Sequence, residues 1–187
     1  MSAGEVHLII GCMFSGKTTE LMRRIKRYRI AGKKCVLIKY IEDTRYSGTK
    51  ACTHDQNMMS ALSVPKLASI SRSEIQSADI VGIDEGQFFP DIVDFCELCT
   101  EMGTTVIVAA LDGDFKRRPF GKICELIPKS ERVDKLQAIC KNCSNNASFT
   151  LRKVASSSLK IVGGSELYEA VCRNCYAPNP SKKKIKK

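Results

Sequence analysis

The residues with the clearest chemical capacity lie in one stretch, Gly11 to Thr18, which reads Gly-Cys-Met-Phe-Ser-Gly-Lys-Thr. This order matches the G-x-x-x-x-G-K-[ST] pattern of a phosphate-binding loop, or P-loop. Its glycines let backbone N–H groups approach phosphate oxygens, Lys17 supplies a positive charge, and the Thr18 hydroxyl can bind Mg²⁺. The residues predicted to bind the phosphates of a nucleotide with its Mg²⁺ are Gly11, Cys12, Met13, Phe14, Ser15, Gly16, Lys17 and Thr18.

Two acidic residues, Asp84 and Glu85, end the apolar run that starts at Ile80. An apolar strand that ends in Asp-Glu has the form of a Walker B element, in which Asp84 holds Mg²⁺ directly or through water. Glu85 then stands at the carboxyl end of the strand, where ligands bind in open α/β sheets, and can act as a general base. The alternative is a solvated acidic turn, which the P-loop in the same chain makes the weaker interpretation.

Four cysteines form two C-x₂-C pairs, Cys140 with Cys143 and Cys172 with Cys175. Such pairs are typical of a zinc site, and each contains an Asn, which tolerates the tight turn that a metal knuckle needs. Four thiolates leave no open coordination position, so we expect a structural zinc that stabilises a small lobe. The alternative is a set of free buried thiols.

Short aliphatic runs that alternate with helical segments predict a mainly parallel sheet with helices on both faces. The predicted strands are Val6 to Ile10, Cys35 to Ile41, Ile80 to Asp84 and Thr105 to Leu111. Helices are expected from Thr18 to Ile30, ended by Gly32, and from Asp91 to Met102. In the second helix Cys96 and Cys99 share an apolar face, which favours core cysteine over a metal pair.

Three segments are less defined. Residues 42–59 are polar and turn-rich and predict an extended loop near the site, in which His54 is more simply a solvated side chain than a functional one. Residues 111–121 carry aromatic and arginine side chains after a strand, which suits a planar ligand and phosphate charge. Between the cysteine pairs, Ala147 to Arg152 and Ser157 to Val162 are predicted to form a hairpin.

Composition narrows the class of protein. Hydrophobic residues make up 43% and charged residues 27% of the chain, as in soluble globular proteins, and no apolar run could span a membrane. No secretory signal is visible, so the ten cysteines are expected to be reduced thiols or metal ligands in the cytosol. The net charge of +10 suggests nucleic acid as a partner, but much of the excess positive charge lies in a lysine-rich tail. Most of the rest lies on what we expect to be the solvent face of the first helix, formed by Arg23, Arg24, Lys26, Arg27 and Arg29.

These features specify Mg²⁺-assisted chemistry at a nucleoside triphosphate without naming the acceptor. If Glu85 activates water, the protein is an NTPase, including one that acts on nucleic acid; if it activates a bound hydroxyl, the protein is a kinase. The length of 187 residues favours the kinase, because a nucleic-acid motor generally needs further domains.

The order of the motifs closely resembles that of the type II thymidine kinases. The match runs from about residue 5 to residue 176, and its segments are Gly11–Thr18, Asp43–Tyr46, Thr53–Asp55, Asp84–Phe89, Leu111–Phe115, Arg118–Gly121, the cysteine pairs, and Val162–Gly164 followed by Tyr168. The resemblance implies transfer of the ATP γ-phosphate to the 5′-hydroxyl of thymidine, to give dTMP for nucleotide salvage. Deoxyuridine is expected as a second substrate, because a contact with the thymine methyl offers only about 1–3 kcal/mol of discrimination.

The same resemblance implies roles for individual residues, with Glu85 as the base and residues 159–163 as a lasso around thymine. Besides the P-loop, the residues expected at ATP and Mg²⁺ are Asp43, Thr44, Arg45, Asp84 and Gln87. Those expected at the nucleoside are Met13, Phe88, Leu111, Phe115, Phe120, Thr150, Leu159, Lys160, Ile161, Val162, Gly163 and Tyr168, of which Met13 and Thr150 match positions near the thymine methyl.

The resulting fold class is α/β, with a mainly parallel sheet in a P-loop (RecA-like) domain and a small C-terminal zinc-binding lobe. The expected divisions are an ATP-binding domain at 1–136, the zinc lobe with the substrate loop at 137–176 and a disordered basic tail at 177–187. The resemblance also implies a cytoplasmic homotetramer that dTTP inhibits. Neither a membrane nor a nucleic acid is expected as a partner.

Overall fold

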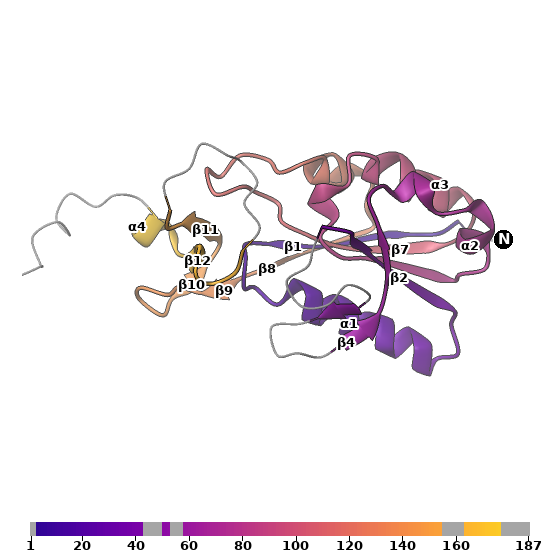
Figure 1. The fold of residues 1–187 in the computed structure, drawn as a ribbon, viewed down its shortest axis with the longest axis horizontal. Helices are drawn as coiled ribbons and strands as arrows, with labels where there is room; N and C mark the ends of the chain where they lie inside the picture. Colours follow the sequence, from indigo (N-terminus) through magenta and orange to yellow (C-terminus); the bar gives the residue numbers. More distant parts are fainter. Residues whose placement is uncertain (1–2, 43–49, 53–57, 155–162, 177–187) are drawn as a thin grey trace, which may run out of the picture.

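A computed structural model describes residues 3–42, 50–52, 58–154 and 163–176. Its centre is a six-stranded sheet in the order β5-β2-β6-β7-β1-β8, and every neighbouring pair in this sheet is parallel (Figure 1). The strands are β1 (Val6–Gly11), β2 (Cys35–Tyr40), β5 (Leu62–Val64), β6 (Ile80–Ile83), β7 (Thr105–Ala110) and β8 (Arg132–Leu136). The mainly parallel α/β sheet predicted from the sequence is therefore confirmed.

Helices cover both faces of the sheet. Helix α1 (Lys17–Ile30) lies on one face, while α2 (Arg72–Gln76) and α3 (Ile92–Glu101) lie on the other (Figure 1). The central strands supply apolar side chains to both sides: in β1, Leu8 and Ile10 pack toward α3, and Ile9 packs toward α1. A strand buried on both faces needs consecutive aliphatic residues, which explains the run Leu8-Ile9-Ile10 of β1; His7, before it, is only partly buried.

The first predicted helix and its end are also confirmed. Helix α1 ends at Ile30, and Gly32 follows with a φ of 77°, in the left-handed region that glycine adopts readily. One expectation about this helix is wrong. Arg24 does not lie on the solvent face, since it is only 7% exposed and its guanidinium binds the carboxylates of Glu20 and Asp134, each at 2.8 Å.

Several short elements were not predicted. Strand β8 carries charged residues at Arg132, Asp134 and Lys135, because it is the outer strand of the sheet and is largely exposed. The segment 42–59, predicted to have no element, contains strand β3 (Lys50–Cys52), which pairs antiparallel with β4 (Met58–Ser60). His54 lies outside the described residues. The short 3₁₀ helices are η1 (Leu67–Ser69), η2 (Gly86–Phe88) and η3 (Ile123–Lys129).

A small group of strands lies beyond β8, and we call the described residues 138–154 and 163–176 the cysteine lobe (Figure 1). Its elements are β9 (Ala138–Ile139), β10 (Asn146–Ala147), β11 (Phe149–Arg152), β12 (Tyr168–Val171) and α4 (Arg173–Tyr176). The partner of β11 is β12, whereas the hairpin predicted from sequence paired this segment with 157–162, which lie outside the described residues. Because β12 leads directly into Cys172, its pairing with β11 brings the second cysteine pair close to the first.

Among the described residues, no helix combines the length and the apolar character needed to cross a bilayer. Cys96 and Cys99 of α3 are fully buried in the core, as their positions in the sequence predicted.

Helix α1 provides a test of the packing against the sheet. Ile25 is 0% exposed, whereas Ile30 on the same helix is 78% exposed. We expect Ile25→Ala to lower the free energy of unfolding by about 2–5 kcal/mol, because it leaves a cavity against β6. Ile30→Ala is the matched control and should change it by less than about 0.5 kcal/mol. Urea denaturation measures both values, and equal losses would contradict this account of the core.

Candidate active site

The P-loop connects the end of β1 to the start of α1, and its backbone has an unusual path. Gly11, Phe14 and Gly16 have positive φ angles of 143°, 65° and 82°. At Gly11 a Cβ would lie 2.4 Å from the carbonyl oxygen of Leu136 in β8, so only glycine fits there. The loop also closes on itself, because the Lys17 ammonium donates to the carbonyl oxygen of Cys12 at 2.7 Å. The fixed residues of the motif are therefore those that this geometry requires.

The two predicted Mg²⁺ ligands lie side by side. The Thr18 hydroxyl, at the start of α1, donates to a carboxylate oxygen of Asp84 at 3.0 Å, and Asp84 follows directly after β6 and is 5% exposed. A hydroxyl and a carboxylate are oxygen ligands of the type that Mg²⁺ prefers. Burial lowers the pKa of the Lys17 ammonium, and the Glu85 carboxylate nearby opposes that shift. The donor set and its charge fit Mg²⁺ with a bound triphosphate.

Glu85 is held in a constrained position beside these groups. Its φ of 55° places a non-glycine residue in the left-handed region, a conformation that costs free energy and is often found at functional sites. The Gln87 amide donates to the Glu85 carboxylate, and the amide oxygen of Gln87 accepts a hydrogen bond from the Leu111 N–H at 2.9 Å. Gln87, predicted at ATP and Mg²⁺, thus contacts Glu85 and the chain just after β7.

The predicted aromatic residues fall into two groups. Phe88 and Phe120 pack edge to face, with ring centroids 5.7 Å apart, and Phe88 also contacts Tyr40 of β2 at 5.3 Å. Phe115 lies instead against the cysteine lobe, where the Arg152 guanidinium is 3.6 Å from its ring centroid and Tyr176 donates from its hydroxyl to the Phe115 carbonyl at 2.7 Å. The contacts of Arg152 and Tyr176 could not be predicted from the sequence. The position of Tyr176 directly after Cys175 was the one available sign that it lies in this lobe.

The loop that carries Phe115 is folded by its own hydrogen bonds. Buried Asp114 accepts from the N–H groups of Lys116 at 2.7 Å and Arg118 at 2.9 Å. At its end, Gly121 approaches the backbone of Gln87 so closely that a Cβ would lie 2.4 Å from the Gln87 carbonyl oxygen. This loop and the segment that follows β6 therefore hold each other in place.

Two further predicted residues belong to the cysteine lobe. Thr150 of β11 is 5% exposed and its hydroxyl accepts a hydrogen bond from the Met13 N–H at 3.0 Å, so this lobe contacts the P-loop directly. Tyr168, the first residue of β12, is 8% exposed. Gly163 is partly buried at the point where the described chain resumes. The segments 43–45 and 159–162, which were also predicted at the site, lie outside the described residues.

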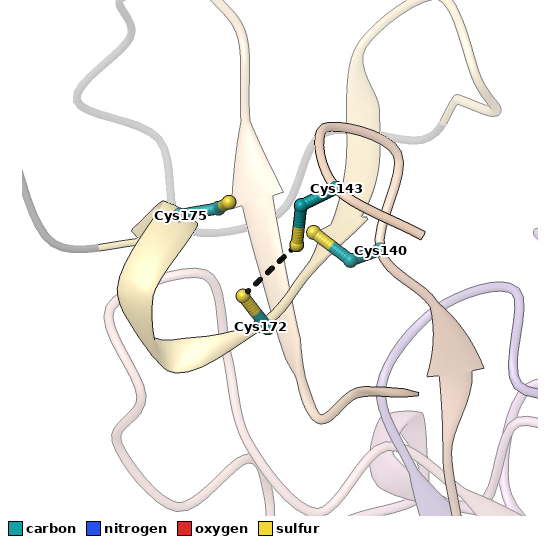
Figure 2. A group of neighbouring side chains, drawn as sticks. All are labelled: Cys140, Cys143, Cys172 and Cys175. Carbon is teal, nitrogen blue, oxygen red and sulfur yellow. Dashed lines mark hydrogen bonds between the residues drawn. The ribbon is translucent and has the colours of Figure 1, made fainter. Parts of the chain in front are cut away.

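The four predicted metal ligands come together at one point of the cysteine lobe. The sulfur atoms of Cys140, Cys143, Cys172 and Cys175 all lie within 4.8 Å of one another, with 3.6 Å between those of Cys143 and Cys172 (Figure 2). A tetrahedron of Zn–S bonds of about 2.3 Å has edges of about 3.8 Å. Desolvation opposes ionisation of the Cys140 thiol, but hydrogen bonds from the backbone of Cys172, Asn142 and Cys143 and from the Cys143 side chain together outweigh it and lower its pKa to about 6. The cluster fits a structural zinc ion.

Comparison with known proteins gives one consistent answer. The family described as "Thymidine kinase" matches residues 4–176. Thymidine kinase of Monkeypox virus is 54% identical over 176 residues, which are 94% of this chain and 98% of the viral protein. The thymidine kinases of Variola virus and of Vaccinia virus (strain Western Reserve) are each 53% identical with the same coverage.

Two glycines in the loop after β7 test how closely it packs. Gly121 has a φ of 57°, and a Cβ there would lie 2.4 Å from the Gln87 carbonyl oxygen. A Cβ at Gly113 would meet its nearest atom, the Arg118 carbonyl oxygen, at 3.5 Å. Gly121→Ala should therefore lower the free energy of unfolding by about 1–3 kcal/mol. Gly113→Ala, the matched control, should change it by less than about 0.5 kcal/mol. Thermal denaturation of both variants gives the comparison, and a stable Gly121→Ala would contradict the close approach.

Proposed function

Because this chain belongs to the thymidine kinase family, we propose that it transfers the γ-phosphate of ATP to the 5′-hydroxyl of thymidine and so produces dTMP. The observation that carries this proposal is the juxtaposition of Thr18, Asp84 and Glu85. Thr18 and Asp84 are hydrogen bonded at 3.0 Å, and Glu85 directly follows Asp84 at the carboxyl end of β6. Phosphate donor, metal and base would then meet where an open α/β sheet places its ligands.

Each of these residues is proposed to have a separate role in the reaction. Backbone N–H groups of the P-loop and the Lys17 ammonium would bind the triphosphate, and Thr18 and Asp84 would hold Mg²⁺, which would supply positive charge to the phosphates. Glu85 accepts the proton of the 5′-hydroxyl as that oxygen attacks the γ-phosphorus. Gln87 fixes the direction of the Glu85 carboxylate by its hydrogen bond. The chemistry of phosphoryl transfer needs little more than this positioning and charge stabilisation.

The nucleoside would lie between the aromatic residues and the cysteine lobe. Phe88 and Phe120 supply aromatic surface beside Glu85, and Phe115 supplies a ring that the Arg152 guanidinium holds from the lobe. A methyl contact distinguishes thymine from uracil by only about 1–3 kcal/mol. Deoxyuridine is therefore proposed as a second substrate.

The cysteine cluster is proposed to bind one structural zinc ion. Its sulfur atoms already converge within 4.8 Å, and the strands next to them are too short to be stable alone. A closed Cys₄ site leaves no position for substrate, so its contribution is to the stability of the lobe.

The family resemblance adds a homotetramer, inhibition by dTTP and a cytosolic location to the proposal. The location fits the proposed use of cysteine, with four residues as metal ligands and the other five described ones as free thiols, because a reducing compartment maintains thiols. Sedimentation of the purified protein with and without dTTP, together with an activity assay, tests the first two.

Glu85→Gln tests the proposed base. The amide keeps the size of the side chain but cannot accept a proton, so turnover should fall by about 10²- to 10⁴-fold while ATP and thymidine still bind. Formation of dTMP and calorimetric binding of both ligands measure the two effects. Glu101→Gln, at the exposed end of α3, is the control and should keep normal turnover. Near-normal turnover of Glu85→Gln would contradict the proposal, as would ATP hydrolysis that DNA or RNA stimulates without phosphorylation of a nucleoside.

Metal analysis tests the zinc site. We expect one zinc ion per chain, and we expect Cys143→Ser to lose it, because a hydroxyl is a much poorer zinc ligand than a thiolate. Cys35→Ser lies outside the cluster and should keep the metal. Inductively coupled plasma mass spectrometry measures the zinc content of each protein. A stable, fully active protein without metal would show that the cluster is a group of free thiols.

A further inference from the structure

One backbone donor of the P-loop is bound by the cysteine lobe. In phosphate-binding loops the N–H groups usually point to phosphate oxygens. Here the Met13 N–H donates instead to the Thr150 hydroxyl at 3.0 Å, and Thr150 is 5% exposed. A side chain far along the sequence therefore fixes the orientation of a peptide group inside the loop.

The neighbouring residues of the P-loop are attached to the same lobe. Cys12 is 2% exposed and belongs to the apolar cluster of the lobe, together with Ala147 and Cys140. The Cys12 thiol donates to the Ala147 carbonyl at 3.4 Å. Phe14 packs against the same cluster. Three consecutive residues of the P-loop thus contact the cysteine lobe.

This cluster depends on the cysteines that form the predicted metal site. Cys140 is 1% exposed at its centre, and Cys172 and Cys175 pack against it. The Cys140 backbone is also fixed by the Lys141 N–H, which donates to the Ala170 carbonyl of β12 at 2.9 Å. Loss of the metal would release these cysteines and loosen the surface on which Cys12 and Phe14 rest.

We propose that the cysteine lobe is a working part of the triphosphate site, in which Thr150 is a positioning residue for the P-loop and the metal state of the four cysteines sets the affinity for the phosphate donor. The inference rests on the proposed function only in that the P-loop binds a nucleotide. By thermodynamic linkage the effect is reciprocal, so a bound nucleotide must raise the affinity for the metal by the same factor.

The proposal differs from a role of Thr150 in contacting the nucleoside. A residue that only contacts the nucleoside changes binding of thymidine and leaves the donor nucleotide alone. A residue that shapes the P-loop changes binding of the donor even when no nucleoside is present. Binding of MgADP to the zinc-loaded protein, measured by titration calorimetry without nucleoside, therefore separates the two roles.

Thr150→Val removes the hydroxyl and keeps the shape of the side chain, whereas Thr150→Ser keeps the hydroxyl. Loss of one hydrogen bond predicts MgADP binding that is roughly three- to tenfold weaker in Thr150→Val. Thr150→Ser should bind MgADP within about twofold of the unchanged protein. The control Thr100→Val on α3 should also bind MgADP within about twofold of it. Unchanged MgADP affinity in Thr150→Val overturns the positioning role, and so does a failure of the unchanged protein to bind MgADP. Phosphorylation of thymidine does not enter this measurement, so a failure of the proposed kinase activity is seen separately.

A second measurement needs no variant and covers the case in which Thr150→Val does not fold. The zinc affinity of the unchanged protein is measured by equilibrium competition with a coloured chelator, with and without saturating MgADP. The linkage predicts a higher zinc affinity with MgADP, by the same factor by which zinc loading raises the affinity for MgADP. An equal zinc affinity in both conditions overturns the link between the metal and the donor site.

Discussion

The hydrogen bond between the Thr18 hydroxyl and the Asp84 carboxylate is the interaction on which the site depends. It joins the start of α1 to the end of β6, two points that the sequence separates by many residues. The parallel sheet makes this contact possible, because β6, β7 and β1 are adjacent and end at the same edge. A P-loop without Asp84 beside it could bind phosphate, but it would lack the second oxygen ligand for Mg²⁺. The order of the strands therefore determines the chemistry.

The groups around that contact are fixed from two directions. From the sheet side, Gln87 links Glu85 to the chain after β7, and Gly121 packs against the Gln87 backbone, so the strained conformation of Glu85 is supported by its neighbours. From the other side, the cysteine lobe holds the Met13 N–H through Thr150 and the Phe115 carbonyl through Tyr176. The same small lobe thus contacts the loop predicted for the donor and the loop predicted for the acceptor. A metal at the four cysteines would therefore support both loops.

The sequence predicted those parts of the molecule whose signal is local. The aliphatic run Leu8-Ile9-Ile10 marks β1 because both faces of the strand are buried there. The spacing of glycine, lysine and threonine marks the P-loop because each residue has its own contact with phosphate. Strand β8 escaped prediction because an exposed outer strand carries charge, and Arg24 was misplaced because its partner Asp134 lies on that strand. The contacts of Gln87 and Tyr176 have no local signal, since each depends on a backbone group that only the folded chain brings near.

The central claim is that one site joins a phosphate donor held by Thr18 and Asp84 to an acceptor hydroxyl that Glu85 deprotonates. A crystal structure with MgADP and thymidine tests this most directly, through the distance from the thymidine 5′-oxygen to the Glu85 carboxylate. The account predicts a hydrogen bond of about 2.6–3.2 Å, with the same oxygen facing the vacant γ-phosphate position. A 5′-oxygen beyond hydrogen-bonding reach, with a water molecule between Glu85 and the phosphates, would contradict it and indicate hydrolysis of ATP instead.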